Sequence, residues 1–242
     1  MHFTQPNDKK MKRENQRYLT ATTIIDSDHK MIRDYAMKTV GASTEPVDRA
    51  VKLYLAVRDN ILYDPYSPFY LPEHYRASYV LKRGRSFCVP KASLLCALGR
   101  ACGIPSRPGF ADVRNHLATK QLLDFIGSNL FVYHGFVEFY LEGKWVKATP
   151  AFNSSLCQRH KVPPLEFNGR DDSIFQLYNL ENRKFMEYVG FHGIYADIPV
   201  DIIVEAWKKA YGKDLIRNWI KRFEEGGDRS LSDFESEDIW KE

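Results

Sequence analysis

Cys88 is the residue whose surroundings in the sequence best suit chemistry. It follows the turn-forming residues Gly84 and Ser86, and an apolar stretch with helical spacing comes directly after it. Pro90 fits a first helical turn, because its missing N–H needs no partner there. The pattern therefore predicts that Cys88 lies at or just before a helix N-terminus. The unpaired N–H groups and the positive end of the helix dipole favour the thiolate, which is the nucleophilic form of cysteine.

A cysteine nucleophile needs a base that takes its proton and later returns it to a leaving group, and the pKa of histidine suits that role. Among seven histidines, His134 lies in a run of aromatic and β-branched residues. This run predicts a β-hairpin over Phe131–Leu141 and Lys144–Thr149. If residues 142–143 form a two-residue turn, the register places Thr149 diagonally across from His134, where a hydroxyl could orient the imidazole.

Each of these residues also has a purely structural interpretation. Cysteine is among the most often buried residue types, and Cys96 and Cys102 have the spacing and apolar neighbours of core residues. A histidine in a strand is often structural, and threonine is common in strands. The ordered combination of a cysteine at a helix N-terminus, a histidine on a strand and a polar residue on the paired strand favours catalysis.

Composition limits the classes of protein to which the chain can belong. The 242 residues are 44% hydrophobic, which allows a large core and excludes a disordered or fibrous protein. No apolar run is long enough for a membrane-spanning helix and the N-terminus is polar, so we expect a cytoplasmic protein with no membrane partner. The four cysteines lack CxxC spacing, which argues against a zinc knuckle or a disulfide framework.

The formal net charge of +4 is unevenly distributed. Residues 1–17 carry +3, residues 224–242 carry −6, and residues 18–223 therefore carry +7. A basic body could attract an anionic partner, but no block rich in Lys and Arg with interleaved aromatic residues marks a nucleic-acid surface. We expect solvated tails on a mildly basic body and no nucleic-acid partner.

Apolar periodicity predicts one α+β domain over residues 1–242. Its core spans about 50–153, with N-terminal helices over about 26–60 and a C-terminal helical extension over about 199–225. The individual helices are expected over Asp26–Val40, from Pro46 to about Val57, over 76–83, from Cys88 to near Gly103, over 116–126, over Pro199–Tyr211 and over Lys213–Glu225. Within 151–198 the pattern predicts only a strand near 174–178.

Three stretches of this chain resemble the transglutaminase-like superfamily of papain-type thiol enzymes. They are residues 84–92 (GRSFCVPKA), residues 103–107 (GIPSR), and the hairpin stretch 133–140 (YHGFVEFY) with 143–145 (GKW). In order and context they are similar to the superfamily's nucleophile helix, connecting strand and histidine-bearing hairpin. The resemblance implies a papain-like core in which a nucleophile helix packs on an antiparallel sheet, with extra helices at both termini.

The resemblance also implies roles for individual residues: Cys88 as the nucleophile and His134 as the general base and acid. The family usually has Asp four residues after the hairpin Trp, and Thr149 stands there instead. Losing an orienting carboxylate can cost about 10⁴ in turnover, as in serine proteases. Asn153 is the alternative orienting residue, because a neutral Asn fills this role in papain-like enzymes.

Further candidates surround this predicted centre. The backbone N–H of Cys88 is one expected oxyanion donor, and Tyr79 and Ser86 are candidates for a second. A dense polar cluster before the hairpin contains Asp112 and Arg114. These two residues are expected either in a solvated loop or at the rim that contacts the substrate.

The leading functional hypothesis is an enzyme that cleaves peptide or protein amide bonds through an acyl-enzyme on Cys88, as a peptidase or amidase without cofactor or metal. A transamidating transglutaminase is an alternative, because both reactions share the acyl-enzyme. A catalytically silent module that binds a peptide or protein in the same cleft is a second alternative, favoured by Thr149.

Overall fold

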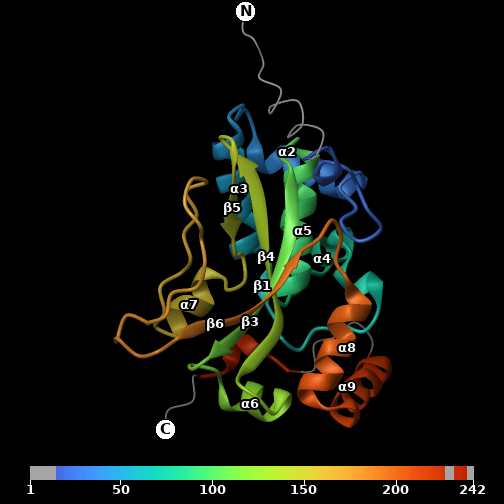
Figure 1. Ribbon diagram of the computed structural model, residues 1–242, viewed down its shortest axis with the longest axis vertical. Coiled ribbons are helices and arrows are strands. Elements are labelled where there is room, and N and C mark those ends of the chain that lie inside the picture. Colours follow the sequence, from blue (N-terminus) through green and yellow to red (C-terminus); the bar gives the residue numbers. More distant parts are fainter. Residues whose placement is uncertain (1–14, 227–231, 239–242) are drawn as a thin grey trace, which may run out of the picture.

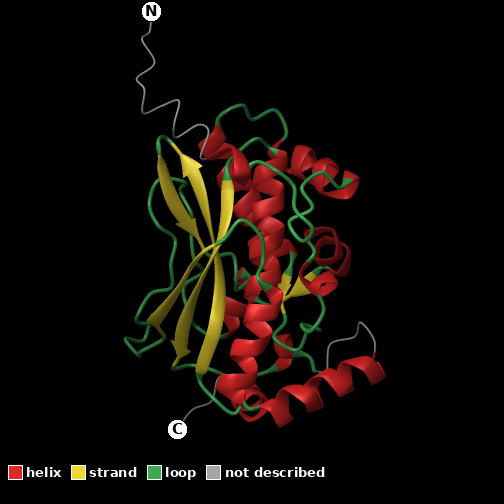
Figure 2. Ribbon diagram, turned by 45° about the vertical axis from the view of Figure 1, so that its right-hand side comes forward, coloured by secondary structure: helices red, strands yellow, loops and turns green. Residues whose placement is uncertain are grey.

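The computed structural model describes residues 15–226 and 232–238. Its main sheet has four antiparallel strands in the order β5-β4-β3-β6. Helices cover one face of this sheet and loops run along the other (Figure 2). The strands are β3 (Ser106–Asn115), β4 (Leu130–Leu141), β5 (Lys144–Ala148) and β6 (Met186–Ile194). The predicted papain-like α+β architecture is confirmed.

Helix α5 (Cys88–Ala101) lies at the centre of the fold, between the sheet and the other helices (Figure 1). Its residues are buried from Cys88 to Arg100. The close packing of α5 on the sheet depends on Gly99, because a Cβ there would come within 2.6 Å of the Phe139 ring. A helix surrounded on all sides explains the continuous apolar run that follows Cys88.

Helices α2 (Lys30–Val40), α3 (Pro46–Asn60) and α4 (Ala77–Arg83) pack on α5. Later in the chain follow α6 (Lys120–Ile126), α7 (Ser154–Arg159), α8 (Val200–Tyr211) and α9 (Lys213–Gly226). The helices predicted from the sequence are present with boundaries shifted by a few residues, whereas α7 was not predicted. Within the described ranges, no helix is both long and apolar enough to cross a membrane.

The prediction of a strand near 174–178 is wrong. Those residues form an irregular segment in which Tyr178 makes an isolated bridge to Lys184. The carbonyls of Gln176 and Leu177 accept hydrogen bonds from the N–H groups of Met186 and Phe185, but no ladder forms. The edge strand β6 forms later instead, over Met186–Ile194. Two glycines and several partly exposed side chains remove the regular alternation from β6, so periodicity did not indicate it.

The register predicted for the hairpin is confirmed where the strands pair. Leu141 faces Lys144, and the ladder continues to Val137 and Ala148. The pairing stops there, so Thr149 lies just beyond the ladder and the stretch of β4 around His134 has no partner on that side. A second, two-stranded parallel sheet pairs β1 (Leu62–Tyr63) with β2 (Arg85–Ser86), directly before Cys88.

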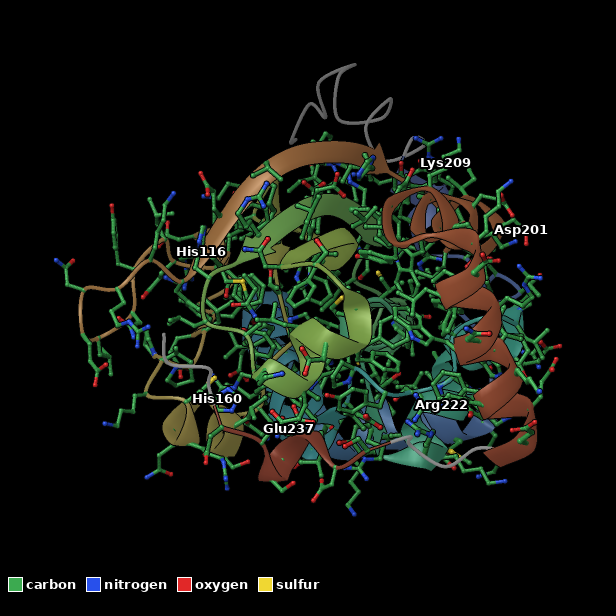
Figure 3. All side chains as sticks on the ribbon, turned by 90° about the horizontal axis from the view of Figure 1, so that it is seen from below. His116, His160, Asp201, Lys209, Arg222 and Glu237 are labelled. Carbon is green, nitrogen blue, oxygen red and sulfur yellow. The ribbon has the colours of Figure 1, made fainter. Side chains whose placement is uncertain are left out.

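The C-terminal elements close the lower end of the molecule. Helices α8 and α9 form a hairpin beside α6, and the segment 232–238 passes under α7 (Figures 1 and 3). The buried Glu237 carboxylate accepts hydrogen bonds from the Tyr66 hydroxyl at 2.7 Å and the Thr119 hydroxyl at 2.5 Å. The backbone carbonyl of Glu237 lies 3.1 Å from Nε2 of His160.

Lys91 is a fully buried cation one turn into α5. Its ammonium donates hydrogen bonds to the carbonyl of Arg58, at 3.0 Å, and to the carbonyl of Ile61. These carbonyls belong to the C-terminal end of α3, where a positive charge also meets the negative end of the helix dipole. Burial nevertheless lowers the pKa of Lys91 to about 7.

This lowered pKa predicts how stability changes with pH. The unfolded chain keeps a lysine pKa of about 10.4, so between about pH 7 and 10 it binds a proton that the folded chain does not. The free energy of unfolding therefore gains a positive slope there, up to about 1.4 kcal/mol per pH unit. In urea titrations at pH 7 and 9, the unfolding free energy of the wild type minus that of Lys91→Met should rise with pH. The buried cysteines, whose raised pKa values act in the opposite direction, are common to both chains and cancel in this difference. An equal pH dependence in the two proteins would contradict the prediction.

Candidate active site

The Cys88 thiol lies at the first residue of α5, as the sequence predicts. Burial raises the pKa of this thiol to about 11. The backbone N–H groups of Gly135, Val89 and Cys88 itself act in the opposite direction, because they point at the sulfur. The expectation of a lowered thiol pKa is therefore wrong for the resting site: the helix N-terminus favours the thiolate, but burial outweighs it.

His134 lies on β4 and is 3% exposed. Burial lowers the pKa of its imidazole to about 3. Its Nε2 is buried and has no hydrogen-bond partner, and the ring centroid lies 5.0 Å from that of Phe175. At neutral pH the resting site therefore holds a neutral thiol and a neutral imidazole.

One cavity connects these two side chains. Cys88 and His134 both line it, and Gly135, next to His134, directs its N–H at the Cys88 sulfur. The approach is close, because a Cβ on Gly135 would lie 2.9 Å from Cα of Val89. The structure thus brings together the nucleophile and the base that the sequence predicts.

The other predicted site residues have different surroundings. The Thr149 side chain is buried and its hydroxyl has no hydrogen-bond partner. Burial raises the pKa of Tyr188 to about 12, and the nearby Thr149 hydroxyl partly offsets this rise. Two buried polar atoms, Oγ1 of Thr149 and Nε2 of His134, are thus unpaired, although such atoms are normally hydrogen-bonded.

Asn153 makes hydrogen bonds only to groups other than His134. Its carbonyl oxygen accepts from the backbone N–H of Tyr63 at 2.9 Å, and its amide nitrogen donates to Ser155 at 2.7 Å and Glu235 at 3.0 Å. These bonds join β1, the start of α7 and the C-terminal segment. The structure gives Asn153 a role in holding Tyr63 in place and does not bring it to the imidazole.

Neither Asp112 nor Arg114 lines the cavity at Cys88. Asp112 accepts hydrogen bonds from the backbone N–H of Tyr133 at 3.0 Å and from Nε2 of His192 at 2.6 Å. Arg114 donates to Oδ1 of Asn129 at 3.0 Å. The pair expected at a substrate-contacting rim instead makes contacts within the sheet and its loops.

Tyr63 is a site residue that sequence reasoning missed. It lines the cavity with Cys88 and His134. Burial raises the pKa of Tyr63 well above its ordinary value and the neighbouring Cys88 adds to the rise, so the phenol stays a proton donor. The pairing of Tyr63 with Ser86 holds it beside the nucleophile, but a two-residue parallel pairing leaves no periodicity in the sequence.

The other expected oxyanion donors are placed elsewhere. Ser86 supports Tyr63 through that backbone pairing, and its side chain does not line the cavity. Tyr79 packs near His74 and also lies outside the lining.

The cavity at Cys88 holds about 60 Å³ of free space and is almost entirely aromatic or aliphatic. Within the described chain, no carboxylate, lysine or arginine lines it. Part of its wall comes from the C-terminal hairpin. The hairpin residues on the wall are Trp207, Tyr211, Trp219 and Phe223.

Hydrogen bonds fix the C-terminal hairpin to β4 close to His134. The Trp207 indole donates to the carbonyl of Val132 at 2.8 Å, and the Tyr211 hydroxyl accepts from the Val132 N–H at 2.8 Å. The same hydroxyl donates to the carbonyl of Leu130 at 3.0 Å. Helix α8 therefore occupies the edge of β4 that β5 leaves unpaired.

The nucleophile helix, the antiparallel sheet and the histidine strand define a papain-like thiol-enzyme scaffold. Residues 33–150, just under half of the chain, match the family model of the transglutaminase-like superfamily. Over these residues the chain is similar to the transglutaminase-like superfamily. This match supports a coarse role in peptidase or acyl-transfer chemistry.

Solved structures with similar folds come from several bacteria. A candidate cysteine protease from Cytophaga hutchinsonii is 16% identical, with a TM-score of 0.46 over 75% of this chain and 54% of its own. A candidate protease from Parabacteroides distasonis is 16% identical, with a TM-score of 0.37 over 56% of this chain and 26% of its own.

The periplasmic domain of TgpA from Pseudomonas aeruginosa is 18% identical, with a TM-score of 0.40 over 57% of this chain and 49% of its own. This chain thus spans about half, or less, of each of these proteins. No curated protein matches the sequence.

The contact at Gly135 gives a prediction for the site. Gly135→Ala places a methyl group against the backbone of Val89, which cannot give way as a flexible side chain can. Overpacking of this kind costs about 1–3 kcal/mol in unfolding free energy. We expect Gly135→Ala to lower the free energy of unfolding, measured by urea titration, by this amount. It should also raise the rate at which a small reagent alkylates Cys88 in the folded state above the wild-type rate. Gly143→Ala, where no atom lies near the added methyl group but φ is positive, serves as the control: it should lower stability without exposing Cys88.

Proposed function

We propose that the protein is a thiol-dependent acyl-transfer enzyme that cleaves amide bonds through an acyl-enzyme on Cys88. The observation that carries this proposal is the shared cavity of Cys88 and His134, with the N–H of Gly135 directed at the sulfur. A nucleophile and a base on separate rigid elements are the parts that such chemistry requires.

The reaction begins with transfer of the Cys88 proton to His134. The sulfur attacks the substrate carbonyl carbon, and the carbonyl π electrons move to the oxygen. When the tetrahedral intermediate collapses, the C–N bond breaks and the leaving nitrogen takes the proton from His134. Water then gives a proton to His134 and attacks the thioester, which releases the carboxylic acid and returns the proton to Cys88. An amine in place of water gives the transamidation product.

Two donors are available for the oxyanion that forms in each attack. The backbone N–H of Cys88 lies at the helix N-terminus, where it has no partner within the helix. Tyr63 lines the same cavity, and its phenol stays protonated across the physiological range because its pKa is raised. Preorganised donors in a site that excludes water are usually the largest single contribution to catalysis.

The proton transfer takes place without a carboxylate to stabilise the imidazolium. Thr149 occupies the position at which the family usually has Asp, and Phe175 packs against the imidazole. Both groups favour the neutral ring, so the charged pair has to form when substrate is present. The same observation supports the second candidate, a binding module whose cleft holds a peptide without cleaving it.

The wall of the cavity indicates the kind of substrate. A charged group would lose its hydration there without gaining a partner, whereas an apolar group removes aromatic surface from water. We therefore propose that the group attached to the scissile carbonyl is uncharged and apolar, as in a peptide with a hydrophobic side chain at that position.

Alkylation of Cys88 by iodoacetamide, mapped by mass spectrometry from pH 5 to 11, tests the catalytic pair. In the wild type we expect reaction near neutral pH, because His134, although uncharged at rest, takes the proton as the new bond to sulfur forms. In His134→Ala the thiol reacts as an isolated buried group with a pKa of about 11, and its rate at pH 7 should fall about 10²-fold or more.

His160→Ala is the matched control, because His160 is also largely buried and its pKa is also lowered by burial, but it lies outside the cavity. The pH dependence of Cys88 alkylation in this variant should equal that of the wild type. If Cys88 reacts only at high pH in the wild type as well, the chain is the silent binding module. Cys96, Cys102 and Cys157, which are buried free thiols, provide internal references.

A pair of chloroacetamides with the same reactive group tests the substrate class. The N-benzyl compound should alkylate Cys88 at least tenfold faster than the N-carboxymethyl compound, because burying the ring contributes about 1.5–3 kcal/mol. Ile126→Lys places a cation on the cavity wall and should reduce this preference at least tenfold. Ile202→Lys, on the exposed face of α8 and outside the cavity, should leave it unchanged. Equal rates for the two compounds in the wild type would contradict the apolar assignment.

A further inference from the structure

Asp112, on the central strand β3, lies between irregularities in both neighbouring strands. On the β4 side, Ala111 faces His134 but Val113 faces Phe131, so two residues of β4 lie opposite Asp112 alone. On the β6 side, the register shifts on each side of the Ala111–Asp112 pair. Bulges in two adjacent strands thus converge on one carboxylate.

The bulged residues from the two sides bind the same oxygen of Asp112. The backbone N–H of Tyr133 on β4 donates to Oδ1 at 3.0 Å, and Nε2 of His192 on β6 lies 2.6 Å from it. Because a carboxylate only accepts, Nε2 of His192 carries the proton. The Tyr133 and His192 rings also stack, with centroids 3.9 Å apart and planes 11° apart.

The β4 bulge determines which residue faces Ala111. If the ladder continued without it from the Val113–Phe131 pair, Val132 would face Asp112 and Tyr133 would face Ala111. In the structure, His134 holds this position opposite Ala111. A shift of one residue also turns every following side chain to the opposite side of the strand, so the bulge decides whether an imidazole or a phenol ring reaches this position.

The backbone conformation at the bulge is costly and has to be stabilised. Tyr133 has φ of +58°, in the left-handed region that is unfavourable for a non-glycine residue. Its N–H bonds to the Asp112 side chain and not to a backbone carbonyl across the ladder. This hydrogen bond to a carboxylate oxygen helps to offset the cost of the conformation. Gly190 leaves room for the carboxylate, since a Cβ there would lie 3.2 Å from Oδ2.

We infer that Asp112, supported by His192, is the positioning residue for His134: it holds the Tyr133 bulge that directs the imidazole toward Cys88. This inference rests on the proposed role of His134 as the base. Asp112 acts through the backbone and touches neither the nucleophile nor the cavity. Through the backbone, Asp112 helps to orient the His134 imidazole, a task that a carboxylate hydrogen-bonded to the imidazole would otherwise perform.

The test is the pH profile of Cys88 alkylation in three variants. Asp112→Ala leaves the Tyr133 N–H without its acceptor, and its profile should move toward that of His134→Ala, with at least a tenfold loss of rate at pH 7. Asp112→Asn keeps an oxygen that can accept both hydrogen bonds and should retain most of the wild-type rate. His192→Phe keeps a ring stacked on Tyr133 but loses the hydrogen bond to Asp112. Its alkylation rate at pH 7 should lie between the rates of Asp112→Ala and Asp112→Asn.

Glu138→Ala is the matched control, because it also removes a carboxylate that links β4 to β3, through Arg107 at 2.6 Å. It should lower stability without moving the profile. If His134→Ala moves the profile and folded Asp112→Ala does not, the positioning role is wrong while the proposed function stands. If Asp112→Ala does not fold, an unchanged profile in His192→Phe overturns the inference. If His134→Ala itself leaves the profile unchanged, the proposed function fails.

Discussion

The close approach of the α5 N-terminus to β4 is the contact on which the site depends. Only a residue without a side chain fits where Gly135 meets the backbone of Val89. That contact brings the Gly135 N–H to the Cys88 sulfur and places the neighbouring His134 in the same cavity. Cys88 and His134 are thus held near one another by close packing of backbone on backbone.

Burial gives the pair an unusual electrostatic balance. Removal from water raises the pKa of the thiol and lowers that of the imidazole, so the uncharged pair is the favoured resting form. A carboxylate beside the imidazole would change this balance, but within the described chain none lines the cavity. Under the proposed function, charge separation therefore has to be driven by the substrate and by the donors that meet its oxyanion.

The helix α5, the hairpin and the candidate pair of Cys88 and His134 could be predicted from the sequence, because each depends on patterns among neighbouring residues. The turn, Pro90 and the apolar run define α5, and aromatic and β-branched residues with a two-residue turn define the hairpin and its register. Tyr63 and the role of Asp112 were not predictable, because each depends on pairing between residues distant in sequence. The prediction of a lowered thiol pKa is wrong because neighbouring residues reveal a helix terminus, whereas the burial of the Cys88 thiol depends on residues distant in sequence.

The order of elements along the chain has a consequence for synthesis. Cys88 and His134 lie in the first 150 residues, whereas α8 and α9, which wall their cavity, come after residue 199. A growing chain therefore places both reactive groups outside the ribosome before the aromatic cover exists. During that interval the cavity lacks the part of its wall that α8 and α9 supply. The last helices to be made are thus the ones that complete the apolar cover of this cysteine.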